Sequence, residues 1–141
     1  MARILVLEDD ADFADLVKLD LEQAGHKVDI TDSGTSAFDL ITETHYDLLI
    51  ADIYIWKEGK VQPDGGLLLA GRLHRLRLTE SSDPRGTMPI IVMTGAVNRP
   101  GQENILKVAS SVGADAVLAK PFSSRDLHKT VHKLLTDHRP T

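Results

Sequence analysis

The chain has 141 residues, of which 42% are hydrophobic and 26% are charged, so it fits one globular domain and excludes collagen-like and wholly disordered proteins. The net charge of -5 disfavours nucleic acid and membranes as partners, and the absence of cysteine excludes disulfide scaffolds and thiolate metal sites. No apolar run is long enough to cross a bilayer and no secretory signal is visible, so a cytoplasmic protein is expected.

The first part of the chain shows the pattern of a strand, a helix and a second strand. A run of branched apolar residues at 4–7 predicts a buried strand. Apolar residues at helical spacing over 12–24, followed by Gly25, predict a helix. Its buried face is expected to carry Phe13, Leu16, Val17, Leu21 and Ala24. Residues 27–31 alternate with period two, as in an edge strand.

The middle of the chain continues this alternation. Ser33 is placed to cap a second helix, whose buried face is expected to carry Ala37, Leu40 and Ile41. The fully apolar run at 48–51 predicts a central strand, and helical spacing returns over 67–78. Residues 79–88 are polar and contain proline and glycine, which predicts a surface loop. The basic stretch at 72–77 has leucines at helical spacing, which favours a solvated helix face over a nucleic-acid contact.

The last part adds two strands and two helices. Strands are expected at 89–93 and 116–119, with a weaker helix over 101–112 between them. Ser123 is placed to cap the last helix, whose apolar face carries Leu127, Val131, Leu134 and Leu135. Five strands alternating with five helices predict an α/β fold with a doubly wound parallel sheet. A single domain is expected, with its core at 2–136 and a frayed tail at 137–141.

Chemically active side chains stand at the carboxyl ends of four predicted strands. They are Glu8, Asp9 and Asp10 after the first strand, Asp52 at the third, Thr94 at the fourth and Lys120 after the fifth. Ligands bind at this edge of a doubly wound sheet. Two carboxylates about 4 Å apart repel by roughly 4 kcal/mol at an effective dielectric near 20, and a hard divalent cation relieves the repulsion. Oxygen ligands favour Mg²⁺, with Mn²⁺ and Ca²⁺ as alternatives.

Five segments in this order are similar to the receiver domain of two-component response regulators. They are 4–10 (ILVLEDD), 46–52 (YDLLIAD), 64–65 (DG), 89–95 (PIIVMTG) and 113–122 (GADAVLAKPF). The similarity covers almost the whole chain, from about residue 2 to 136. It implies a flavodoxin-like fold with strand order 2-1-3-4-5.

The resemblance also implies a role for each residue of the candidate site. Asp52 would accept a phosphoryl group, with Asp9 a direct metal ligand, Glu8 acting through water and the backbone carbonyl of Tyr54 a third protein ligand. Thr94 would move its hydroxyl onto the phosphoryl group, and Lys120 would neutralise one of its oxygens. The peptide bond to Pro121 would be cis.

The implied partners follow from the same resemblance. The donor would be a histidine kinase or a histidine phosphotransfer protein. The domain would catalyse only its own phosphorylation and dephosphorylation, and would not otherwise be an enzyme. Its fourth helix, fifth strand and last helix would switch and contact an unidentified downstream protein. The chain would be a monomer or a phosphorylation-dependent dimer.

The sequence departs from the family pattern at three places. The first acid is Glu8 instead of the commoner aspartate, and the loop at 53–64 is longer than usual and contains Trp56. Val117 stands where an aromatic residue usually swings inward on activation, which puts aromatic switching in doubt. His128 and His132 have the i, i+4 spacing of metal ligands, but without a third ligand a surface pair is favoured.

Two other functions are open alternatives. A non-phosphorylated receiver-like module for dimerisation or interaction would keep the fold, but it would not need the complete set of site residues. A Mg²⁺-dependent phosphatase with an aspartyl nucleophile usually has a second acid two residues after the nucleophile, where this chain has Tyr54.

Overall fold

One parallel sheet runs through the centre of the molecule. The computed structural model describes residues 2–52, 55–57, 60–62, 66–79, 83–94, 114–120 and 122–137. The sheet contains β1 (Arg3–Leu7), β2 (Lys27–Thr31), β3 (Leu48–Asp52), β6 (Ile90–Thr94) and β7 (Ala116–Ala119). Its order is β2-β1-β3-β6-β7, and every neighbouring pair is parallel. Because β6 and β7 are the predicted fourth and fifth strands, the predicted order is confirmed, with β2 at an edge and β3 in the centre.

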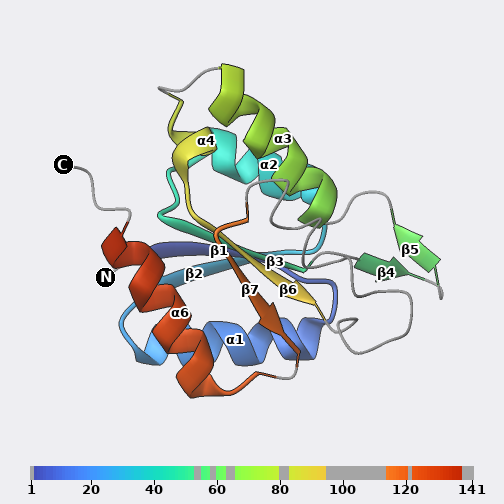
Figure 1. Ribbon diagram of the computed structural model, residues 1–141. Coiled ribbons are helices and arrows are strands. Elements are labelled where there is room, and N and C mark those ends of the chain that lie inside the picture. Colours follow the sequence, from blue (N-terminus) through green and yellow to red (C-terminus); the bar gives the residue numbers. More distant parts are fainter. Residues whose placement is uncertain are drawn as a thin grey trace.

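Helices cover both faces of this sheet (Figure 1). The helices α1 (Ala11–Gln23) and α6 (Ser124–Asp137) lie on one face, and α2 (Gly34–Glu43) and α3 (Gly66–Thr79) lie on the other, with the one-turn helix α4 (Pro84–Thr87) beside them. Four of the five predicted helices are therefore confirmed. The predicted helix at 101–112 lies outside the described residues. The short α4 falls in the segment predicted as a loop, where Asp83 caps it by accepting a hydrogen bond from the amide of Arg85.

Side chains alternate between two hydrophobic cores along each central strand. Ile4, Val6, Leu48 and Ile50 pack with Val17 and Leu21 of α1 and Leu127, Val131 and Leu134 of α6. The intervening Leu5, Leu7, Leu49 and Ala51 pack with Ala37 and Ile41 of α2 and Leu69 and Leu73 of α3. This period of two is the reason that strands with helices on both faces are apolar throughout.

Polar side chains fix the ends of the helices where the sequence predicts them. Ser33 accepts a hydrogen bond from the amide of Ser36 at 3.1 Å, and Ser123 accepts one from the amide of Asp126 at 3.0 Å. Gly25 has a φ of 96°, the left-handed conformation that glycine adopts most easily after a helix. The structure therefore confirms the predicted role of the two serine caps and of the glycine that follows α1.

The buried face of α1 differs from the prediction. Leu16 is 66% exposed and Ala24 is also exposed, whereas Ala14, Val17 and Leu21 form the buried stripe. Leu16 immediately precedes Val17, so it is turned about 100° around the helix from that stripe. The apolar pattern alone did not distinguish a leucine in the core from one beside it.

The long segment after β3 contains an unpredicted second sheet. Its strands β4 (Ile55–Lys57) and β5 (Lys60–Gln62) pair antiparallel, with Trp56 opposite Val61. Figure 1 shows this hairpin beside the carboxyl ends of the central strands. No helix in the described part of the chain is long and apolar enough to span a membrane.

Paired polar groups hold the central sheet near its amino edge, where Arg3 begins β1, Tyr46 precedes β3 and Asp29 lies halfway along β2. The buried Tyr46 donates a hydrogen bond from its hydroxyl to Asp29 at 2.7 Å, and the Arg3 guanidinium contacts the same carboxylate at 3.2 Å. Asp47 accepts a hydrogen bond from the backbone amide of Arg3 at 2.8 Å. The hydrogen bond from Tyr46 lowers the pKa of Asp29, while burial and this carboxylate raise the pKa of Tyr46 to about 12. This edge thus joins β1, β2 and β3 through groups of complementary charge.

Candidate functional site

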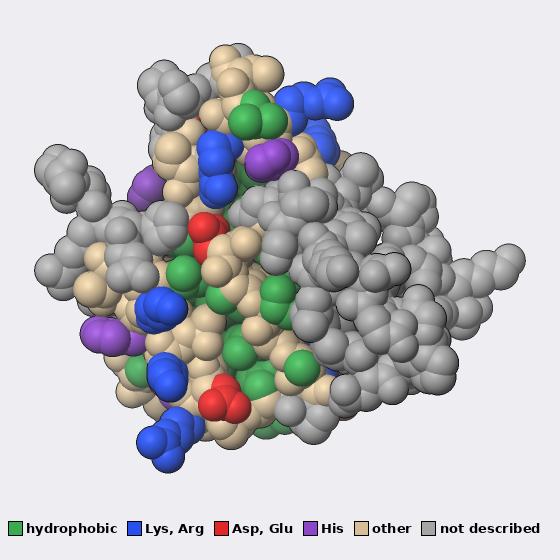
Figure 2. Space-filling model, in the orientation of Figure 1, with side chains coloured by type: hydrophobic (Ala, Val, Ile, Leu, Met, Phe, Trp, Pro, Cys, Tyr) green, Lys and Arg blue, Asp and Glu red, His purple; other side chains and the backbone are tan. Residues whose placement is uncertain are grey.

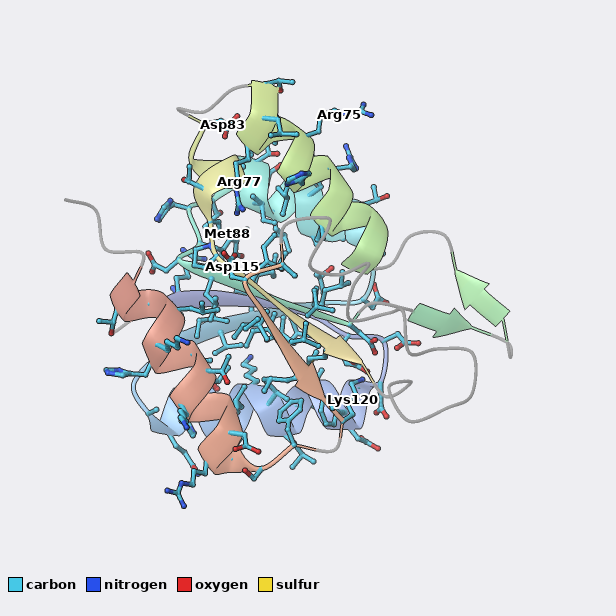
Figure 3. All side chains as sticks on the ribbon, viewed as in Figure 1. Arg75, Arg77, Asp83, Met88, Asp115 and Lys120 are labelled. Atoms are coloured by element: carbon cyan, nitrogen blue, oxygen red, sulfur yellow. The ribbon has the colours of Figure 1, made fainter. Side chains whose placement is uncertain are left out.

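Three charged side chains meet at the carboxyl edge of the sheet. Glu8 directly follows β1, Asp52 ends β3 and Lys120 directly follows β7. Since Leu7 of β1 pairs with Ala51 of β3, the next residues along these two strands are Glu8 and Asp52. Figure 3 shows Lys120 at the end of β7, at the same edge. The parallel register therefore brings together groups that are far apart in the sequence.

Lys120 bridges the two carboxylates. Its Nζ lies 2.8 Å from Oε2 of Glu8 and 2.8 Å from Oδ2 of Asp52. The same ammonium group lies 4.6 Å from the centroid of the Phe13 ring, which contacts Phe122 edge-on with the centroids 5.6 Å apart. The aromatic pair limits water on one side of the ammonium group and so strengthens its attraction to both acids.

Burial changes the protonation of this group of charges. Only 3% of Glu8 is exposed, and burial together with the nearby Asp52 charge raises its pKa to about 7, although the hydrogen bond from Lys120 opposes the shift. Burial lowers the pKa of Lys120, but its bonds to Asp52 and Glu8 outweigh burial and raise the pKa above its ordinary value. Lys120 therefore carries a positive charge at neutral pH.

A third carboxylate completes an acidic cluster. Oxygen atoms of Glu8, Asp9 and Asp52 lie within 4.8 Å of one another. The cluster offers only oxygen ligands, which suit a hard divalent cation such as Mg²⁺. The described part of the predicted ligand set therefore fits Mg²⁺.

Several predicted site residues lie partly or wholly outside the described residues. Tyr54 and Pro121 are outside them, so a carbonyl ligand at Tyr54 and a cis bond at Pro121 stay predictions. Thr94 is the last residue of β6, and its side chain is not among those described. Val117 is half-buried in β7 opposite Val92 and packs against the core beneath α2 and α3.

The aromatic pair beside Lys120 has a functional position that the sequence interpretation missed. Phe122 belongs to the segment that resembles receiver domains, but no role was assigned to it. Phe13 was predicted only as part of the apolar face of the first helix. Their signal in the sequence is weak, because the contact joins residues more than a hundred positions apart.

The two histidines of α6 differ in their surroundings. The Nε2 atom of His128 lies 2.9 Å from Oδ1 of Asp20, which also accepts a hydrogen bond from Ser124 at 3.0 Å. His132 is exposed. The contacts of His128 therefore fasten α6 to α1, and the interpretation of the two histidines as a surface pair stays a prediction.

Comparison with known proteins identifies the family. Residues 4–132 match the model of the response regulator receiver domain. The chain belongs to this family. Among curated relatives, the response regulator receiver protein CpdR of Brucella abortus is 33% identical over 141 residues, covering 96% of this chain and 98% of CpdR. The virulence transcriptional regulatory protein PhoP of Salmonella choleraesuis is 31% identical, covering 96% of this chain and 52% of PhoP. The chain thus spans about half the length of that relative.

Solved receiver structures have the same fold. A CheY-like response regulator receiver domain protein from Methanospirillum hungatei superimposes with a TM-score of 0.77 at 28% identity, covering 98% of this chain and 96% of that one. The receiver domain of sensor histidine kinase PA1611 from Pseudomonas aeruginosa has a TM-score of 0.76 at 20% identity, covering 96% and 98% of the two chains. That structure has a magnesium ion coordinated in its active-site cleft. The receiver fold of the present chain is flavodoxin-like.

Proposed function

We propose that Asp52 accepts a phosphoryl group from a phosphohistidine on a histidine kinase or a histidine phosphotransfer protein. The observation that carries this assignment is the pair of 2.8 Å contacts from Lys120 to Asp52 and Glu8. A lysine fixed against the acceptor carboxylate is placed to offset the charge of an incoming phosphoryl group. Membership of the receiver family supports the same function.

The transfer follows from the chemistry of a carboxylate nucleophile. An oxygen of Asp52 attacks phosphorus, an O–P bond forms, and the P–N bond to the donor imidazole breaks. The electron pair of that bond stays on the imidazole nitrogen, which then takes up a proton. The product is an acyl phosphate on Asp52, and hydrolysis later returns the carboxylate. Lys120 holds a positive charge beside the carboxylate throughout, while the Phe13 ring shields it from water.

A divalent cation fits the acidic side of the site. Glu8, Asp9 and Asp52 would hold Mg²⁺, and Tyr54 would add its backbone carbonyl. When bound, the ion supplies electrostatic stabilisation for phosphoryl oxygens. Asp9 would contact it directly, and Glu8 would contact it through water, because Glu8 is also fixed to Lys120. The magnesium ion in the PA1611 receiver domain supports this choice over Mn²⁺ and Ca²⁺.

The protein then acts as a signalling switch in the cytoplasm. Its chemistry is limited to its own phosphorylation and dephosphorylation. Thr94 and the surface formed by 101–112, β7 and α6 would transmit the change to a downstream protein, with the chain a monomer or a phosphorylation-dependent dimer. A phosphatase is disfavoured because Tyr54 replaces the second acid. A non-phosphorylated module is disfavoured because the acids and Lys120 converge at one site.

Labelling with acetyl phosphate tests the acceptor. Intact-protein mass spectrometry should show one added phosphoryl group in the wild type with Mg²⁺ and none in Asp52→Asn. The label should be stable to acid but labile to base and hydroxylamine. Asp47→Asn is the matched control, since Asp47 lies just before the other end of β3 and should label normally. A label that persists in Asp52→Asn, or that maps to a serine or histidine, would contradict the assignment.

A further inference from the structure

The Lys120 ammonium group has an aromatic contact in addition to its two ion pairs. Its Nζ lies 4.6 Å from the centroid of the Phe13 ring, while the carboxylates of Glu8 and Asp52 each lie 2.8 Å away. A cation over the face of a ring, within about 6 Å of its centroid, is attracted by the negative charge of that face. Only 21% of the Lys120 side chain is exposed, so water screens this attraction weakly. The ring is therefore a third attractive partner of the ammonium group.

Two contacts fix the position of the Phe13 ring. Phe13 is the third residue of α1, and its backbone amide donates a hydrogen bond to the capping Asp10 at 3.1 Å. Its ring meets that of Phe122 edge-on, with an angle of 80° between the ring planes. Phe122 stands two residues after Lys120 in the chain, and both rings pack against the core beneath α1 and α6. The pair of rings thus joins the start of α1 to the segment that carries the lysine.

The start of α1 also holds Glu8, the second partner of the lysine. The backbone amide of Asp10 donates a hydrogen bond to Oε1 of Glu8 at 3.3 Å, and Oε2 accepts one from Lys120. The third partner, Asp52, is the proposed acceptor. When one of its oxygens bonds to phosphorus, negative charge moves from the carboxylate to the phosphoryl oxygens. Glu8 and Phe13 do not react, so they keep the ammonium group in place during that change.

We propose that Phe13 is a positioning residue for phosphoryl transfer, because the face of its ring holds the Lys120 ammonium group beside the reacting carboxylate. The inference rests on the proposed function of Asp52. A lysine side chain is flexible and loses rotamer entropy when it is held in one place. The ring restricts Lys120 before the donor arrives, so the transfer step itself loses less entropy. An aliphatic side chain would fill the same space without attracting the ammonium group.

Substitutions that separate the charge of the ring face from the volume of the ring test this role. A phenylalanine with three ring fluorines at position 13 keeps nearly the same shape but attracts a cation weakly, and Phe13→Leu has no ring face. Both changes should lower the maximal rate of labelling by acetyl phosphate at saturating Mg²⁺ about three- to tenfold. Phe13→Tyr keeps the ring and should label within about twofold of the wild-type rate. The Mg²⁺ concentration that gives half of the maximal rate should stay the same in all three.

The contact between Phe13 and Lys120 can also be measured without metal or phosphate. In the proton NMR spectrum of the metal-free wild type, the ring should shift the ε-protons of Lys120 upfield. This shift should disappear in Phe13→Leu but largely persist in Phe13→Tyr and in the fluorinated protein, because both keep a ring at the same place. A slower rate with a retained shift in the fluorinated protein would assign the effect to the charge of the ring face.

Phe38 on α2 provides the matched control. The guanidinium of Arg72 lies 3.9 Å from the centroid of the Phe38 ring, and that of Arg85 lies 5.5 Å from it. These arginines belong to α3, over which blue side chains gather in Figure 2, and to α4. Both helices lie on the face of the sheet opposite α1 (Figure 1). Phe38→Leu and the fluorinated residue at position 38 therefore change a cation–π contact away from Asp52, and both should label at the wild-type rate.

The labelling rates distinguish a failure of this role from a failure of the proposed function. Wild-type rates in both Phe13→Leu and the protein fluorinated at position 13 would overturn the inference, although Asp52 would remain the acceptor. A defect in Phe13→Leu with a wild-type rate in the fluorinated protein would also overturn it, since the ring would then act only through its volume. So would an equal defect in Phe38→Leu, or an unshifted Lys120 signal in the wild type. A wild type that is not labelled at Asp52 would overturn the proposed function, and the inference with it. Urea unfolding shows that each variant is folded.

Discussion

The two edges of the central sheet use charge in opposite ways. At the amino edge, Arg3 and Tyr46 both contact Asp29, so positive and neutral donors surround one carboxylate. At the carboxyl edge, Glu8 and Asp52 share one ammonium group, and Asp9 adds a further negative charge. The first arrangement stabilises the fold by itself. The second retains repulsion between carboxylates, which a cation can relieve.

This difference separates stability from function along the same strands. Buried Glu8 has its pKa raised by burial, which shows that the fold bears a cost in keeping a carboxylate there. The hydrogen bond from Tyr46 lowers the pKa of Asp29, which shows that this carboxylate is favoured in its charged form. Substitutions at the carboxyl edge should therefore change phosphorylation more than stability, and substitutions at the amino edge should do the opposite.

After the loss of the acceptor in Asp52→Asn, the largest effect is expected from Asp9→Asn. Loss of this proposed direct ligand should lower Mg²⁺-dependent labelling by acetyl phosphate at least about tenfold, since even residues that only support metal ligands contribute 10–100-fold. Removal of one of three neighbouring negative charges should keep the free energy of unfolding within about 1 kcal/mol of the wild-type value. Labelling rates over a range of Mg²⁺ concentrations, with urea unfolding of the same samples, measure both effects.

A neighbouring acid provides the matched control for Asp9. Asp10 caps α1 by accepting a hydrogen bond from the amide of Phe13 at 3.1 Å, and asparagine caps helices equally well. Asp10→Asn makes the same change in charge one residue away and should label at the wild-type rate. Equal loss of labelling in both variants would assign the effect to the general negative field and not to ligation by Asp9.

A smaller effect is expected at the amino edge. Tyr46→Phe removes the hydroxyl that donates to Asp29 and should lower the free energy of unfolding by about 1–2 kcal/mol. This predicted loss is at the lower end of the range for hydrogen bonds to charged groups, because Asp29 is partly exposed and water can replace the hydroxyl. Labelling of Asp52 should not change. A labelling defect in Tyr46→Phe without a loss of stability would break the comparison between the two edges.

The stability difference between the wild type and Tyr46→Phe should depend on pH in a defined direction. The pKa of Asp29 is lowered in the fold, so its contribution is complete above about pH 4 and is lost as pH falls through the lowered value. The pKa of Tyr46 is raised to about 12, so its contribution is complete below about pH 10 and is lost as pH rises through 12. Urea unfolding at several pH values should show a constant difference between these limits.

Much of the fold could be predicted because its signals are local. The apolar strand at 48–51, the capping serines and the glycine after α1 act on their immediate neighbours. Strand order came from the family resemblance, and the sheet then placed Glu8, Asp52 and Lys120 at one edge. The described part of the candidate site could be predicted for the same reason, because the carboxyl ends of parallel strands meet at one edge of the sheet.

Other features depend on contacts that a local pattern does not contain. The exposure of Leu16 depends on which side of α1 meets the sheet. Several neighbouring residues of this helix are apolar, so the sequence pattern alone fits more than one buried side. The hairpin of β4 and β5 lacks the Asn-Gly or Asp-Gly pair that gives the strongest short-range signal, since Glu58 and Gly59 stand between its strands. The ring of Phe13 beside Lys120 joins α1 to the end of β7, and only the folded chain places the two together.

The smallest effect on phosphorylation is expected from Val117→Ala, which also tests how the carboxyl edge reports its state. Val117 is half-buried, so the truncation should cost about 0.5–2 kcal/mol, less than most Leu→Ala changes in a core, with labelling unchanged. Val92→Ala is the matched control, because Val92 pairs with Val117 and is fully buried, so its truncation should cost more.

Thr94→Ala should also keep labelling largely intact, yet uncouple it from changes around 101–112. Amide chemical shifts with and without beryllofluoride measure that coupling. A full wild-type shift pattern in Thr94→Ala, or its loss in a folded Val117→Ala protein, would contradict the proposed coupling through Thr94.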